Sequence, residues 1–352
     1  MKRLRAPLPV SVRGYTKHNS RMEPRRIGHS QVFPIGLGCM NFTHAYGVPP
    51  PPEVAKQVIH RALDLGITHF DTAALYGFGR SESLLGEVLP PFRSRIHLAS
   101  KCGMTGINGK RVIDGRPETL KRTLDESLAR LRTDVIDLYY LHRWDKRVPI
   151  EESVGALADM VASGKVREIG LSEVSADTLR KAAAVHRIAA VQSEYSLWTR
   201  NPEVAVLEEC REVGTTFVAF SPLGRGFLAD ALKDPSELVE GDIRRTMPRF
   251  QDPDWQANAA LLKPYRELAL EAGCTPAQLA LAWLLRKAPH IVPIAGTTST
   301  AHLEENSRAA GVDLSPSLLA RLEALVNPTT VVGARYSGAT QAEIDTEELP
   351  SR

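Results

Sequence analysis

Short apolar runs alternate with longer segments of helical periodicity along most of the chain. The runs hold few polar positions, as is typical of parallel strands covered on both faces. Proline and glycine mark the helix ends, with Pro117 at a first helical position and Gly164 closing a helix. The runs predict strands at 33–39, 66–71, 96–101, 135–142, 166–172, 189–193, 215–221 and 291–296. Helices are predicted near 52–65, 81–88, 116–131, 151–163, 175–186, 202–213, 256–272, 276–287, 299–310 and 316–326.

This order predicts an α/β protein, a single (β/α)8 TIM barrel with extra helices and long loops on its C-terminal face. Eight strand–helix units joined by short links favour a barrel over an open sheet. An open doubly wound sheet is the alternative, and it would normally show GxGxxG after its first strand. The corresponding stretch, "GLGCMN" at 36–41, lacks that pattern.

Charge is distributed unevenly over the 352 residues, whose net charge is +3. The first 21 residues carry six basic side chains and no acidic one, and removing those six charges leaves −3 for the rest. We expect 1–24 to be a basic, disordered tail rather than a targeting or nucleic-acid-binding arm. The barrel is expected over 25–330 and a C-terminal tail over 331–352.

The composition is that of an ordinary globular protein, with 43% hydrophobic and 24% charged residues. No apolar run approaches the roughly 18 residues of a membrane-spanning helix. The four cysteines are widely spaced and form no CxxC pair, which argues against a zinc site and a disulfide framework. We therefore expect a cytoplasmic protein that binds no metal, nucleic acid or membrane.

Polar side chains stand at the ends of the predicted strands, where a barrel has its catalytic face. Asp71, Lys101 and His142 end strands two to four, and Tyr76 follows Asp71 in a glycine-containing loop. Any one of them could be a turn, cap or core residue, which is the commoner role of a single such residue. Their convergence on one rim favours a catalytic site. The later strands end in Ser172, Gln192, Ser221 and Gly296.

The four residues Asp71, Tyr76, Lys101 and His142 have a coherent chemistry. A tyrosine hydroxyl has an ordinary pKa near 10, and a neighbouring ammonium lowers that pKa by stabilising the phenolate. A carboxylate such as Asp71 would keep a buried Lys101 charged. His142 could orient a carbonyl oxygen or share in proton transfer. Such a site would protonate an oxygen that gains negative charge, as carbonyl reduction requires.

Several motifs, in order and at barrel-consistent spacing over about 25–330, resemble the aldo-keto reductase superfamily. They are "FDTAALYGFGRSESLLG" at 70–86, "SK" at 100–101, "DLYYLH" at 137–142, "IGLSEVS" at 169–175, "VQSEYSL" at 191–197, "FSPLGRGFL" at 220–228 and "GTTSTAHLEEN" at 296–306. The resemblance implies a (β/α)8 barrel and NADP(H)-dependent reduction of aldehydes or ketones. It also implies that Asp71, Tyr76, Lys101 and His142 form the catalytic tetrad, with Tyr76 as general acid.

The resemblance further implies a set of cofactor-binding residues. Ser172 and Gln192 would bind the nicotinamide amide, whereas Glu173 stands where relatives often have Asn and its direct role is in doubt. Phe220 would stack on the nicotinamide ring, and Arg225 would supply charge beside the pyrophosphate. The full set is Ser172, Gln192, Phe220, Ser221, Leu223, Gly224, Arg225, Gly296, Thr297, Thr298, His302, Glu305 and Asn306.

One part of that set departs from the family pattern. Relatives often carry Lys or Arg just after Gly-Thr and Arg where His302 stands, but this chain offers Thr298, Ser299 and His302. Hydroxyls and a mostly neutral imidazole bind a 2′-phosphate less strongly than a guanidinium does. We expect NADP(H) to serve as cofactor, with a weaker preference over NAD(H) than is usual in the family.

The substrate pocket is expected to involve Met40, Phe42, Trp144 and Trp198, which follow strand ends or lie in nearby loops. Such an apolar rim favours bulky aromatic or alicyclic carbonyls over acidic ones. Two other functions remain open. One is a cofactor-sensing regulatory subunit, like potassium-channel β subunits, which can retain the tetrad. The other is a cofactor-free barrel isomerase or lyase, against which the 220–228 and 296–306 motifs speak.

Overall fold

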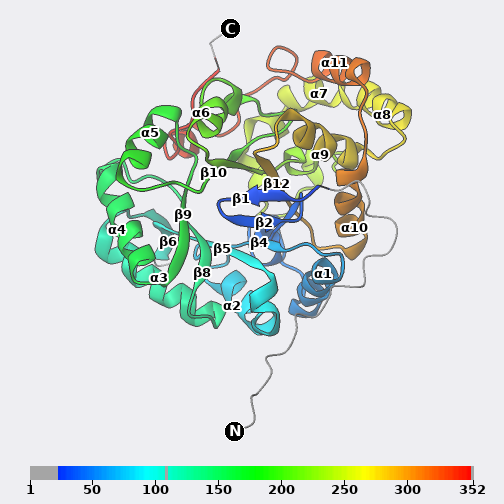
Figure 1. Ribbon diagram of the computed structural model, residues 1–352. Coiled ribbons are helices and arrows are strands. Elements are labelled where there is room, and N and C mark those ends of the chain that lie inside the picture. The colour runs from blue at the N-terminus through cyan, green and yellow to red at the C-terminus, as the bar shows by residue number, and fades with distance from the viewer. Residues whose placement is uncertain (1–22, 108–109, 350–352) are drawn as a thin grey trace.

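The structure, a computed structural model, describes residues 23–107 and 110–349. Its centre is a closed barrel of eight parallel strands in the order β10-β11-β12-β3-β4-β5-β8-β9 (Figure 1). This closure confirms the predicted barrel and rules out the open sheet. The strands are β3 (Gly36–Gly38), β4 (His69–Asp71), β5 (His97–Cys102), β8 (Ile136–Leu141), β9 (Val166–Ser172), β10 (Ala190–Glu194), β11 (Thr216–Phe220) and β12 (Ile291–Gly296).

Helices surround the barrel (Figure 1) and pack their apolar stripes against the outer faces of the strands. Local signals set their ends: α3 begins with Pro117, and Thr275 and Gln278 form a capping box at the start of α9. The helices of the eight units are α1 (Pro52–Asp64), α2 (Arg80–Val88), α3 (Pro117–Leu131), α4 (Ile150–Ala162), α5 (Ala176–Val185), α6 (Val206–Glu212), α9 (Pro276–Lys287) and α10 (Thr300–Arg308). The additional helices are α7 (Asp254–Ala259), α8 (Leu262–Glu271), α11 (Pro316–Leu325) and α12 (Gly338–Gln341).

A hairpin that the sequence pattern did not reveal, β1 (Arg25–Ile27) and β2 (Ser30–Val32), lies across the N-terminal ends of the strands (Figure 1). Ile27 and Val32 are fully buried against side chains inside the barrel. The backbone oxygen of Arg26 accepts a 3.0 Å hydrogen bond from Thr216 Oγ1 at the start of β11. The hairpin closes this end of the barrel and leaves the opposite end for the site.

The loops at the C-terminal ends of the strands are longer than those at the N-terminal ends. The loop after β5 contains the hairpin β6 (Met104–Ile107) and β7 (Lys110–Ile113). Short 3-10 turns recur in the loop after β11 and elsewhere. They are η1 (Met40–Phe42), η2 (Pro90–Arg95), η3 (Asn201–Glu203), η4 (Gly224–Gly226), η5 (Pro235–Glu237), η6 (Ile243–Thr246), η7 (Pro248–Phe250) and η8 (Ala309–Gly311).

The chain ends were predicted to be tails. The tail assigned to 1–24 lies almost wholly outside the described residues. The C-terminal boundary needs correction, because residues 331–349 pack on the barrel. Tyr336 and Ile344 are buried, and the Asp345 N–H donates a 2.9 Å hydrogen bond to the backbone oxygen of Glu173. We call 331–349 the C-terminal segment, and it belongs to the folded unit.

Candidate active site

Lys101 connects the residues of the predicted tetrad. Its ammonium donates hydrogen bonds to Asp71 Oδ1, to the Thr72 backbone oxygen at 2.8 Å and to the Tyr76 hydroxyl at 3.2 Å. Asp71 is the last residue of β4 and Lys101 lies near the end of β5, so the parallel register brings them together. The His142 ring stands edge-on to the Tyr76 ring, with centroids 5.7 Å apart. The structure thus brings all four residues into one buried cluster at the barrel mouth.

The loop that carries Tyr76 depends on Gly77. Its φ is +59°, and a Cβ at this position would approach the Thr43 side chain to 2.8 Å. A larger residue would therefore be strained in backbone and in packing. Gly77 lets the chain turn back into α2 while the Tyr76 ring points over the end of the barrel.

The charges in this cluster differ from the sequence-based expectation in one respect. Burial works to lower the pKa of Lys101, but Asp71 and Tyr76 outweigh it, so the ammonium is retained. Burial raises the pKa of Tyr76, and the nearby Lys101 charge offsets that rise only in part. The phenol is therefore a protonated donor at neutral pH rather than an unusually acidic one. Burial, with Arg143 and Lys101, holds the pKa of His142 well below its usual range, so the imidazole is neutral.

Two predicted cofactor contacts have protein partners in the structure. The Gln192 side-chain amide donates a 2.7 Å hydrogen bond to Asp71 Oδ2. Ser172 Oγ accepts a 3.1 Å hydrogen bond from Arg143, which also donates to the His142 backbone oxygen at 2.6 Å. Both predicted residues lie at the cavity, and Gln192 also fixes the tetrad carboxylate. The sequence analysis missed Arg143, although a basic residue directly after the strand-end His142 could have indicated a further site residue.

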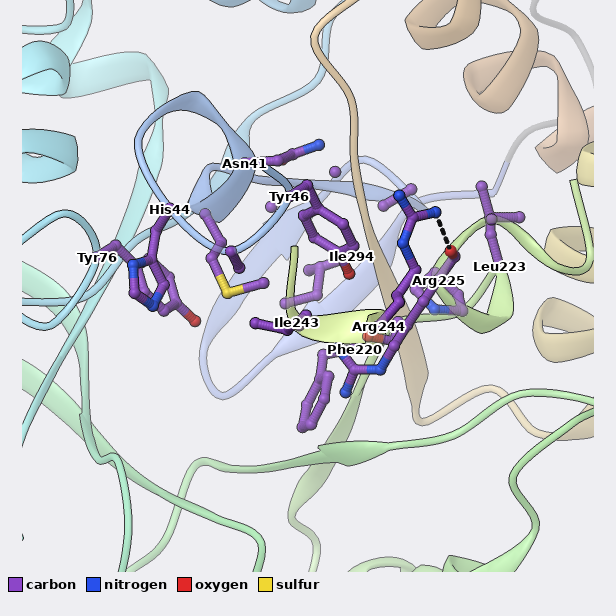
Figure 2. Close-up of a pocket in the computed structure, with 18 of the residues that line it drawn as sticks. Asn41, His44, Tyr46, Tyr76, Phe220, Leu223, Arg225, Ile243, Arg244 and Ile294 are labelled. Atoms are coloured by element: carbon purple, nitrogen blue, oxygen red, sulfur yellow. Dashed lines mark hydrogen bonds between the residues drawn. The ribbon is translucent and has the colours of Figure 1, made fainter. Parts of the chain in front are cut away.

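A cavity of about 650 Å³ opens at the C-terminal ends of the strands. Figure 2 shows Tyr76 and His44 at one end of it, Arg225 and Arg244 at the other, and Phe220 between them. This volume is typical of a site for an organic ligand. Of the predicted cofactor residues, those that line the cavity are Ser172, Gln192, Phe220, Ser221, Leu223, Arg225, Gly296, Thr297, Thr298, His302, Glu305 and Asn306. Gly224 is buried beneath this lining, against Trp198.

Arg225 belongs to a buried charge network that links the loop after β11 to the C-terminal segment. Its guanidinium donates to Glu194 Oε2 at 2.8 Å and to the Tyr336 hydroxyl at 2.9 Å. Glu173 accepts from Arg335 and, at 2.9 Å, from the Glu194 N–H. The doubt about Glu173 is thereby explained, because its carboxylate clamps the C-terminal segment and does not line the cavity.

The loops 43–47 and 239–247 pair with each other at the cavity, and we call them the strap. Tyr46 and Asp242 form an antiparallel bridge, and the Ile243 N–H donates a 2.9 Å bond to the Ala45 oxygen. The Arg244 guanidinium lies over the Tyr46 ring at 5.3 Å. Sequence reasoning missed these residues, because they pair only after the barrel has brought two distant loops together. Other lining residues that it missed include Asn41, His44, Arg111, Arg143, Ile294, Tyr336, Ser337, Thr340 and Glu343.

Of the four residues expected to contact substrate, Met40 lies in the cavity lining and three do not. Phe42 is buried in the core. Trp144 donates its indole N–H to the Val148 oxygen at 2.8 Å and packs against the core. Trp198 is buried and stacks on Phe227 at 4.1 Å. This corrects the expectation for these three aromatic residues, which anchor loops.

Neither a metal site nor a single membrane-spanning helix is present in the described ranges, 23–107 and 110–349. No group of three or more His, Cys, Asp or Glu side chains there could hold a metal ion. In the same ranges, no single helix is long and apolar enough to cross a membrane. One helix pair, Asp254–Glu271 with Pro276–Lys287, meets the length and composition criteria together, but it is bent by 76°.

Comparison with known proteins agrees with this geometry. The model of the aldo/keto reductase family matches residues 34–327. The chain belongs to the aldo/keto reductase family. Membership confirms the resemblance noted in the sequence, and it makes the protein an oxidoreductase of the carbonyl-reducing class.

Individual aldo/keto reductases resemble the chain over nearly its full length. A curated relative from Schizosaccharomyces pombe, aldo-keto reductase yakc [NADP(+)], is 41% identical over 93% of this chain and 98% of its own. The glycerol dehydrogenase AKR11B4 from Gluconobacter oxydans superposes with a TM-score of 0.80 at 25% identity, covering 91% of this chain and 98% of its own. An aldo/keto reductase from Klebsiella pneumoniae, solved with NADP and acetate, gives a TM-score of 0.69 at 26% identity, covering 90% and 99%.

Proposed function

We propose that this aldo/keto reductase uses NADP(H) to reduce an aldehyde or ketone to an alcohol, with Tyr76 as the general acid. The single observation that carries the proposal is the position of the Lys101 ammonium, which bonds the Asp71 carboxylate and, at 3.2 Å, the Tyr76 hydroxyl. The relative from S. pombe is named for NADP(+), and the Klebsiella structure contains NADP.

The cavity fits a nicotinamide dinucleotide in size and in the chemistry of its lining. Phe220 offers a flat face for a ring, and Ser172 and Gln192 offer polar atoms for a carboxamide. Thr298 and His302 stand at the start of α10, where backbone N–H groups favour a phosphate. When bound there, the reduced cofactor supplies the hydride.

The chain's own residues supply the proton and hold the carbonyl. The Tyr76 hydroxyl donates a hydrogen bond to the carbonyl oxygen and then transfers its proton as negative charge develops there. Lys101 stabilises the phenolate that remains, and Asp71 keeps Lys101 charged. The neutral His142 ring stands edge-on to the Tyr76 ring and orients the same oxygen. Hydride and proton together convert the carbonyl to an alcohol.

The cofactor preference rests on His302 and its neighbours. His302 is exposed at the cavity rim, and no lysine or arginine lines the cavity at the start of α10 in the described chain. We propose that NADPH is preferred over NADH, but by less than in relatives with a guanidinium at this position. We also propose a cytoplasmic location, which the unpaired cysteines Cys39, Cys102, Cys210 and Cys274 favour.

A carbonyl panel tests the proposed function. Purified protein is titrated with NADPH by fluorescence, and NADPH oxidation is then followed by absorbance with uncharged and charged aldehydes and ketones. Binding with steady turnover supports the reductase. Binding with negligible turnover of every carbonyl would favour the regulatory alternative, and failure to bind NADPH would favour a cofactor-free barrel enzyme.

A further inference from the structure

Arg143 differs from the other arginines around the cavity. Four arginines line it, and three of them have carboxylate partners: Arg111 with Glu343 at 2.5 Å, Arg225 with Glu194 at 2.8 Å and Arg244 with Asp242 at 2.6 Å. Arg143 has no carboxylate oxygen within 4.0 Å in the described parts of the chain. It is therefore a half-buried cation whose charge no protein group neutralises.

Much of the Arg143 guanidinium also lacks a hydrogen-bond partner. Its Nη1 donates to the His142 oxygen and to Ser172 Oγ. Within the described residues, Nε and Nη2 make no hydrogen bond, so most of the five N–H donors are available. A planar guanidinium with free donors matches the two oxygens of a carboxylate.

The location of Arg143 links it to the reacting carbonyl. It follows His142 in the chain, and its charge acts on the pKa of both His142 and Tyr76. The other charged side chains in the lining here have partners, because Asp71 pairs with Lys101 and Arg111 pairs with Glu343. His44 adds no positive charge at neutral pH, since burial, with Arg111 and Arg80, lowers its pKa. The lining of this end of the cavity thus carries one uncompensated positive charge, next to the tetrad residue His142.

We propose that Arg143 binds a carboxylate of the substrate, and that the preferred substrates are carbonyl compounds with a carboxylate close to the carbonyl group, as in 2-oxo acids. This inference rests on the proposed reductase function and specifies its substrate class. It replaces the sequence-based expectation of substrates without an acidic group. Arg143 was not among the residues that the motifs indicated.

Phenylglyoxylate and its methyl ester form a matched pair for the test. Both present an activated ketone, and only the acid carries the charge. We expect wild-type protein to favour the acid in kcat/KM, and Arg143→Met to lower kcat/KM for the acid about 10- to 100-fold more than for the ester, since hydrogen bonds to charged groups are of that strength. Arg143→Lys should restore part of the preference. Arg122→Met is the control, because it removes an exposed arginine that does not line the cavity, and it should leave the acid-to-ester ratio of kcat/KM nearly unchanged.

Two further measurements separate the outcomes. If Arg143→Met weakens NADPH binding by fluorescence titration and leaves the ratio unchanged, Arg143 serves the cofactor through Ser172 and the proposal is overturned. A wild-type protein that shows no preference for the acid also overturns it. If the wild type reduces neither compound and no carbonyl of the panel, the reductase function fails. Calorimetric titration with phenylglyoxylate then still tests the carboxylate site. The proposal requires phenylglyoxylate to bind wild type more tightly than Arg143→Met.

Discussion

The ion pair between Glu173 and Arg335 should hold the C-terminal segment over the barrel mouth. Both side chains are almost fully buried, and Arg335 lies 39 residues beyond the end of the last barrel strand, β12. Glu173→Gln is a selective substitution, because the amide keeps the shape of the side chain and can still accept a hydrogen bond from the Glu194 N–H. The charge is the main property that changes.

The magnitude follows from the charges left behind. Arg225, Arg249 and Arg335 share this buried region with two carboxylates, Glu173 and Glu194, and Arg335 lies 4.0 Å from Glu194, which already pairs with Arg225. Removing one partner of a buried pair costs about 3–5 kcal/mol. Because each 1.4 kcal/mol is tenfold, this cost shifts the docking equilibrium of the segment roughly 150- to 4,000-fold.

Urea unfolding and limited proteolysis measure this effect. Glu173→Gln should lower the urea midpoint or, if only the segment is released, expose 331–349 to protease. The KM for substrate should rise, because Tyr336, Ser337 and Thr340 line the cavity. Glu208→Gln is the control, since its partner Arg211 is exposed and such surface pairs contribute less than about 1 kcal/mol. If Glu173→Gln behaved like Glu208→Gln in all three measurements, the clamp would be refuted.

Three other predictions concern titration and cofactor choice. Since burial raises the pKa of Tyr76 and His142 stays neutral, kcat/KM for reduction should be level from about pH 7 to pH 9, and a limb centred near pH 7.5 would contradict this. His302→Arg should raise the preference for NADPH over NADH about tenfold by adding a charged donor, measured as the ratio of the two kcat/KM values, and an unchanged ratio would place the 2′-phosphate elsewhere. Burial lowers the pKa of His69 and His97, whose Nδ1 atoms lie 2.9 Å apart, so both are neutral when folded. Their contribution to the free energy of unfolding is present above the unfolded pKa of about 6.5. It is lost as the pH falls below about 6.5, by up to about 1.4 kcal/mol per pH unit for each histidine. His97→Gln should therefore reduce the slope of the free energy of unfolding, measured with urea, against pH below about 6.5.

The repeating units of the barrel could be predicted because their signals are local. Apolar runs and helix-end residues such as Pro117 and Gly164 gave the strands and helices to within a few residues, except that the helix predicted at 256–272 is divided into α7 and α8. Parallel topology then placed Asp71, Lys101 and His142 at one rim. Each of these predictions requires only the local sequence and the general rule that catalytic residues of such barrels lie at the C-terminal ends of the strands.

The features that the sequence did not reveal depend on contacts between distant segments. The closing hairpin has strands of three residues, too short for a periodic pattern. The C-terminal segment docks through charges such as Arg335 whose partners lie more than 140 residues earlier. Large apolar residues are ambiguous for a similar reason, since Trp198 could face a ligand or the core and only the packed structure shows its stacking on Phe227.

In the proposed reaction, the Tyr76 hydroxyl, held beside Lys101, delivers the proton. The most direct test compares Tyr76→Phe with wild type in two measurements on the same preparation, the Kd for NADPH and the kcat for a carbonyl that the wild type reduces. Phenylalanine keeps the ring contact with His142 and removes only the hydroxyl 3.2 Å from Lys101. We expect an unchanged Kd with kcat reduced by at least about 100-fold. A variant that binds NADPH and reduces the carbonyl at close to the wild-type rate would contradict it.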